Sequence, residues 1–189
     1  MLYLVLGLAI FFAIHLVRML APEWRNARLA SMGENKWKGI YSLISLLSLV
    51  LIVWGFGQAR IGATQLFTPP SWGAHVALLL MAIAFILMMA ANLPTGRIKQ
   101  ALKHPFLVSI KLWAFAHLLA NGDLASAVLF GSFLAYAVWN RISVKRRGGA
   151  NPVANSSSSD LIAVVSGLAI WAGFVYWGHE WLFGVNPIA

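Results

Sequence analysis

The chain has 189 residues, of which 60% are hydrophobic and only 10% are charged, and its mean hydropathy is +0.78. Soluble domains carry about 25% charged residues, so the composition excludes an ordinary soluble domain. The formal net charge is +9, but the basic residues lie between long apolar runs and form no polar face for nucleic acid. The absence of cysteine excludes disulfides, thiolate catalysis, iron–sulfur clusters and C-x-x-C-H haem attachment.

Six apolar segments predict the fold. Each reaches or approaches the roughly 20 residues that a helix needs to cross a bilayer, and backbone polar groups inside lipid must pair within the helix. The segments are residues 1–20, 39–57, 72–93, 105–120, 124–140 and 161–183. The fourth is short and contains Lys111, which we expect to snorkel or to face the bundle interior. The prediction is an all-α integral membrane bundle of about six transmembrane helices.

The distribution of charge predicts the orientation of this bundle. The first, third and fifth loops hold 12 of the 14 Lys and Arg residues. The positive-inside rule therefore places these loops in the cytoplasm and both the N and C termini on the non-cytoplasmic side. The third and fifth loops lie on the same side of the membrane only if the fourth segment also crosses it. The charge count therefore supports the fourth segment, residues 105–120, as a transmembrane helix.

The chain order also suggests a domain organisation. We expect a five-helix membrane domain over residues 1–145, a flexible cytoplasmic linker over residues 146–160, which are rich in Gly, Asn and Ser, and a sixth transmembrane helix over residues 161–183. Ser159 and Asp160 predict the N-cap of that helix. The sequences TPPS at 68–71 and NGD at 121–123 predict turns before the third and fifth spans.

Candidate chemistry centres on the five histidines, because ionisable groups inside spans are costly and usually functional. His75 and His179 lie near the ends of spans beside aromatic residues, where we expect interfacial side chains. His104 precedes Pro105 and marks either a helix start or a ligand.

His15 and His117 are harder to explain as packing. Apolar residues such as Phe11 and Trp113 lie one turn away from them, so an imidazole without a partner faces a desolvation cost of roughly 2–7 kcal/mol. Either an interhelical hydrogen bond or axial ligation of haem iron by two neutral imidazoles accounts for both residues. Arg18, one turn from His15, suits a haem propionate or serves only as a topology determinant.

Several blocks resemble the NnrU family, bacterial membrane proteins named for an association with denitrification. They are HLVR at residues 15–18, PEWR at 22–25, KGIYSL at 38–43, VWGFGQAR at 53–60, HP at 104–105 and LWAFAHLLANGD at 112–123. The resemblance covers residues 1–145. The His-Pro and Trp-x-x-x-His elements recur in the related 15-cis-zeta-carotene isomerase of plants and algae, an integral membrane protein that binds haem b.

The resemblance implies that His15 and His117 are the axial metal ligands of haem b, with Arg18 and His104 as further candidate cofactor-binding residues. A cysteine proposed as an exchangeable ligand in the isomerase falls at Ala114, so ligand switching is not implied here. Centred spans would place His15 and His117 at depths that differ by roughly 13 Å. A haem held between them would then lie strongly tilted toward the membrane plane. An inward shift of the fourth helix would relax this tilt; alternatively, His104 pairs with His15 on the cytoplasmic side.

We therefore expect a haem b protein of a bacterial inner membrane, with membrane lipid as a partner and no nucleic acid. Its ligand would be a lipid-soluble polyene, in a cis–trans isomerase, or a small nitrogen oxide, in a redox or sensing protein. Whether the protein is an enzyme stays open at this point. The alternative is a non-haem channel or accessory subunit whose histidines only bridge helices.

Overall fold

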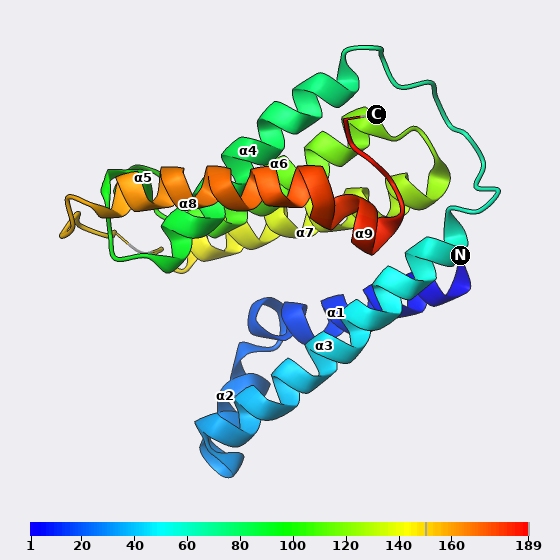
Figure 1. Cartoon of the computed structure of the whole chain (residues 1–189). Helices are drawn as coiled ribbons and strands as arrows, with labels where there is room; N and C mark the ends of the chain where they lie inside the picture. The colour runs from blue at the N-terminus through cyan, green and yellow to red at the C-terminus, as the bar shows by residue number, and fades with distance from the viewer. Residues whose placement is uncertain (150, 189) are drawn as a thin grey trace. The chain divides into compact units, whose positions relative to one another are not determined.

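The computed structural model describes residues 1–149 and 151–188, and every regular element within them is helical (Figure 1). Five of these helices are long and apolar enough to cross a membrane. They are α1 (Leu2–Leu20), α3 (Glu34–Ala59), α4 (Gly73–Asn92), α7 (Leu124–Arg146) and a last one in which α8 (Ser159–Gly173) continues through the π-helical segment η1 (Phe174–Gly178) into α9 (His179–Phe183). The apolar helix α6 (Pro105–Ala120) is shorter. The predicted all-α membrane fold is confirmed.

Two further helices occupy loops for which no helix was predicted. The polar helix α2 (Pro22–Met32) fills the first loop and α5 (Arg97–Leu102) lies in the third. Pro22 stands at the first position of α2 and Glu23 in its first turn, which is a favourable helix start because proline lacks the amide that would go unpaired there and a carboxylate complements the helix dipole. The signal was therefore present in the sequence.

The described chain divides into two compact units, one formed by residues 1–65 with 123–132 and the other by the remaining described residues. In the first unit α1 packs along α3 (Figure 1). A Cβ atom added to Gly55 would lie 2.5 Å from the backbone nitrogen of Leu4, and one added to Gly7 would lie 2.9 Å from that of Ile52. The two glycines therefore let the helix backbones approach closely, as small residues do between membrane helices.

In the second unit α4 packs against both α6 and α8. A Cβ atom added to Gly167 of α8 would lie 2.6 Å from the Cα atom of Ile86, and one added to Gly73 would lie 2.6 Å from the carbonyl oxygen of Leu119. Glycine is therefore the residue that permits the contact of α4 with each neighbour.

The segment expected as a linker makes specific hydrogen bonds within the second unit. The Lys103 ammonium donates to the side-chain oxygen of Asn151 over 2.8 Å. The backbone nitrogens of Asn155 and Ser156 donate to the carbonyl of Thr95 over 2.9 and 3.2 Å. These bonds hold the segment against the residues on either side of α5.

The predicted N-cap of the last span is wrong. The helix α8 begins at Ser159 and has no side-chain cap. The Asp160 carboxylate instead accepts hydrogen bonds from the backbone nitrogens of Arg97 and Ile98, because tertiary packing brings the unpaired amides of α5 within its reach. The predicted tight turn at NGD is not formed: α6 ends at Ala120, Asn121 is extended, and Asp123 forms an isolated β-bridge with Gln65. Asp123 also caps α7 by accepting from the backbone nitrogen of Ser126 over 2.9 Å.

Candidate functional site

His117 lies in the last turn of α6 with a defined ring orientation. Its Nδ1 atom is 2.8 Å from the carbonyl oxygen of Trp113, and its ring centroid is 5.5 Å from that of the same tryptophan. The Trp113 ring in turn meets Phe133 of α7 edge to face at 5.3 Å. The predicted aromatic surroundings of His117 are confirmed.

His15, in the first unit, has the same kind of support. Its Nδ1 atom is 2.7 Å from the carbonyl oxygen of Phe11, and the imidazole stacks on the Phe11 ring at 3.9 Å with an interplanar angle of 19°. Tyr41 of α3 lies 5.1 Å away, centroid to centroid. The sequence placed Phe11 beside His15 correctly, while Tyr41 comes from tertiary packing.

These contacts assign the tautomer of both rings. A carbonyl oxygen only accepts, so Nδ1 must carry the proton in each case. A neutral imidazole then has its lone pair on Nε2, and a hydrogen bond from the other ring nitrogen to a carbonyl is the usual way in which proteins orient a metal-binding histidine. Both residues therefore present the nitrogen that a metal ligand requires.

His179 joins His117, although the sequence suggested only an interfacial side chain. The two ring centroids are 6.5 Å apart and the ring planes differ by 23°. His179 begins α9, and its Nδ1 atom donates to the carbonyl oxygen of Val185 over 2.7 Å. Periodicity could not reveal this pair, because the π-helical residues before His179 interrupt the ordinary helical register.

The other predicted residues have varied surroundings. Arg18 is exposed in the last turn of α1 and His75 is exposed near the start of α4. His104 is the N-cap residue of α6, and its Nε2 atom is buried with no hydrogen-bond partner among the described residues. Partial burial lowers the pKa of His104, and the cations of Arg141 and Lys103 lower it further. Lys111 is half-buried on α6.

The available donors restrict the kind of metal site. Residues 1–149 and 151–188 contain no group of three or more His, Asp or Glu side chains that could hold a metal ion. A protein-only zinc site needs three or four such ligands. Two imidazoles are instead the set that completes an iron whose four other ligands come from a porphyrin.

The fold and these histidines define a class: a multi-pass helical membrane protein with oriented imidazoles on its helices. The sequence profile of the NnrU protein family matches residues 3–187, and the chain belongs to this family. The match extends past the region in which we noted the resemblance and includes the last span with His179. No curated protein and no solved structure gives a match.

Proposed function

We propose that this NnrU family member is a haem b-binding membrane protein in which His117 is one axial ligand. Histidine supplies such a ligand as the neutral ring, through a nitrogen that carries a lone pair. The observation that supports the proposal is the 2.8 Å hydrogen bond from Nδ1 of His117 to the Trp113 carbonyl, because it leaves the lone pair on Nε2. His15 has the matching bond to Phe11 and is the second ligand predicted from the sequence.

The donor chemistry fits this cofactor. The described part of the chain has no cluster of three or more metal-ligating side chains, and a porphyrin makes such a cluster unnecessary. Aromatic rings beside both imidazoles, Trp113 at His117 and Phe11 at His15, supply an apolar wall of the kind that surrounds haem. Arg18, one turn from His15, is the proposed partner of a propionate, and His104 is a further candidate in the cofactor site.

When bound, the haem iron would supply one-electron chemistry and an electrophilic centre. Two uses are proposed: assistance to cis–trans isomerisation of a lipid-soluble polyene, and sensing or electron transfer with a small nitrogen oxide. The chain itself orients the imidazoles through backbone carbonyls and keeps water from the ring faces with aromatic side chains. In either use these contacts fix the position of the ligand nitrogens.

The cofactor proposal is tested on the full chain, expressed with sufficient iron and purified in detergent. We expect a Soret band with resolved visible bands in the reduced form, and a pyridine haemochrome spectrum of b type. His117→Ala should lose most of the bound haem or convert it to a different spin state. A colourless wild-type protein would overturn the proposal and leave a channel or accessory subunit, in which the same histidines only hydrogen-bond within the membrane.

A further inference from the structure

The last span changes its helical geometry directly before His179. Residues Phe174–Gly178 form a π-helical segment between α8 and α9. A π-turn adds one residue to a helical turn, which shifts the facing of all later residues by roughly 100° relative to an uninterrupted α-helix. A Cβ atom at Gly178 would lie 2.9 Å from Cδ2 of Phe174, so this local geometry favours glycine. Such segments are frequent at functional sites.

The C-terminal residues then fix the His179 ring. Gly184 ends α9 in the left-handed conformation, with φ 66° and ψ 23°. The chain reverses there and brings the Val185 carbonyl within 2.7 Å of Nδ1 of His179. The rings of Phe174 and Phe183 meet the imidazole edge to face at 5.8 and 5.2 Å. His179 is thus held in one orientation and, like His117, carries its proton on Nδ1.

The centroid separation of the two imidazoles matches the distance that a shared metal would need. Two metal–nitrogen bonds of about 2 Å each place the centroids of two opposed imidazole ligands roughly 6 Å apart, and the observed separation of His117 and His179 is 6.5 Å. The 23° angle between the His117 and His179 planes also places the rings nearly parallel.

Membrane depth favours the same pair. His117 lies in the last turn of α6 and His179 near the end of the last span. Both spans run from the cytoplasmic to the non-cytoplasmic side in the orientation predicted from charge, so both histidines lie near the same surface. His15 lies five residues before the end of α1, which is predicted to be the cytoplasmic end. Pairing His117 with His179 removes the depth mismatch that a pair with His15 creates.

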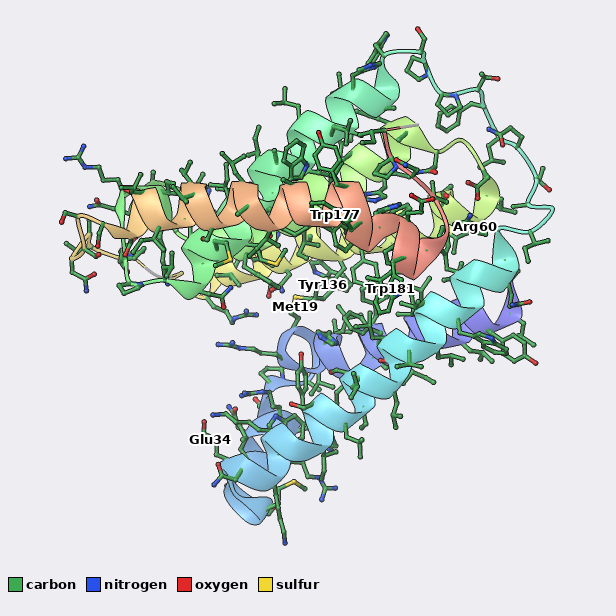
Figure 2. The ribbon with its side chains drawn as sticks, viewed as in Figure 1. Met19, Glu34, Arg60, Tyr136, Trp177 and Trp181 are labelled. Atoms are coloured by element: carbon green, nitrogen blue, oxygen red, sulfur yellow. The ribbon has the colours of Figure 1, made fainter. Side chains whose placement is uncertain are left out.

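The aromatic residues beside His179 agree with this depth. Trp177 and Trp181 are 73% and 84% exposed and flank His179 on the C-terminal part of the last span, where Figure 2 labels them. Exposed tryptophans mark the boundary between lipid and water. The pair of histidines therefore lies close to an aromatic belt on the predicted outer side.

We propose that His179, placed by the π-helical segment and the reversed C-terminal residues, would hold the haem iron together with His117. This inference rests on the proposed function, since it assigns the second ligand of the same haem. It gives the last span a role in binding the cofactor and replaces His15 as the second ligand.

The experiment compares single variants of the full chain by optical, magnetic circular dichroism and electron paramagnetic resonance spectra of the ferric haem. We expect the wild type to be low-spin with two imidazole ligands. His179→Ala should keep at least half of its haem through His117 but become largely high-spin, and millimolar imidazole should restore the low-spin spectrum. His75→Ala is the matched control, because His75 is an exposed histidine of the same unit, and should retain the wild-type spectrum.

A second variant tests the proposal if His179→Ala does not fold. His179→Met keeps a long side chain and offers a thioether, and His/Met ligation raises the reduction potential of a haem. We expect a positive shift of the midpoint potential, which a merely structural histidine would not cause.

The failures of the two proposals are distinguishable. A low-spin wild-type spectrum that persists in both His179 variants and is lost in His15→Ala would overturn the His179 assignment and leave the haem proposal intact. A wild type without haem would overturn both.

Discussion

The Asp160 carboxylate, at the start of α8, accepts a 2.8 Å hydrogen bond from the backbone nitrogen of Arg97 at the start of α5. The neighbouring amide of Ile98 donates to the other carboxylate oxygen over 3.1 Å. A Cβ atom at Gly96 would lie within 2.2 Å of that carboxylate, so the contact requires glycine there. One acidic side chain thus joins the last span to the connection after α4.

Asp160→Ala should therefore loosen this end of the second unit. Both amides lose a charged acceptor, and hydrogen bonds to charged groups contribute about 1.5–3 kcal/mol each. Because the Arg97 bond is exposed, water replaces much of the lost acceptor, so we expect the free energy of unfolding to fall by only about 1–3 kcal/mol. Hydrogen exchange at Arg97 and Ile98 should accelerate. Ser157→Ala, at an exposed position of the same segment, is the control. Unchanged protection of the two amides in Asp160→Ala would contradict the assignment.

The contact of α1 with α3 gives a prediction with a matched control. Gly55→Ala places a methyl group 2.5 Å from the Leu4 backbone, whereas a Cβ atom at Gly57 meets nothing within 4 Å. Overpacking of this kind costs about 1–3 kcal/mol. We expect Gly55→Ala to lower the free energy of unfolding in mixed detergent by that amount and Gly57→Ala to change it little. Equal free energies of unfolding for the two variants would contradict the close contact of α1 with α3 at Gly55.

The π-helical segment is tested by its glycine. Gly178→Ala brings a methyl group to 2.9 Å from Cδ2 of Phe174, while a Cβ atom at Gly173 has no neighbour within 4 Å. We expect Gly178→Ala to displace His179 and to lower the low-spin fraction of the bound haem at least twofold, with Gly173→Ala near the wild type. Identical spectra of the two variants would show that the π-helical segment does not position a haem ligand.

His104 predicts a dependence of stability on pH. Burial, with Arg141 and Lys103, lowers its pKa in the folded protein below the usual 6.5. The unfolded chain therefore binds a proton at His104 more readily than the folded protein does. The contribution of His104 to the free energy of unfolding is complete above about pH 6.5 and is lost as the pH falls through that value toward the folded pKa.

The measurement compares thermal unfolding of the wild type and His104→Gln between about pH 7 and about pH 5. We expect the wild type to lose more stability on acidification than the variant. His75→Gln, at an exposed position, should behave like the wild type. A parallel decline of the wild type and His104→Gln would exclude His104 as the source.

The orientation in the membrane can be measured without background, because the chain has no cysteine. Single variants Ser31→Cys, Ser71→Cys and Ser157→Cys lie at exposed positions in the first, second and fifth predicted loops. From the outer side, a membrane-impermeant maleimide should label only Ser71→Cys, and permeabilisation should expose the other two. Labelling of Ser157→Cys in intact membranes would reverse the assigned topology of the last span.

The helical content of the protein could be read from its sequence because apolar length is a local property. A run such as residues 72–93 contains no charge, and lipid leaves a helix as its only conformation. The neighbours of His15 and His117 at one helical turn, Phe11 and Trp113, followed from the same periodicity. The orientation of the imidazoles toward backbone carbonyls is equally local, since each bond spans four residues.

The partnership of His117 with His179 and the capping of α5 by Asp160 could not be predicted in this way. Each joins residues about 60 positions apart, and the π-turn that aims His179 leaves no periodic signature in the sequence. The amino-acid sequence by itself determined which segments are helical and the predicted orientation of each span in the membrane, since both depend on local hydrophobicity and charge. Only the tertiary structure decided which side chains meet, because that depends on where glycines let helix backbones approach and on where the helical register shifts.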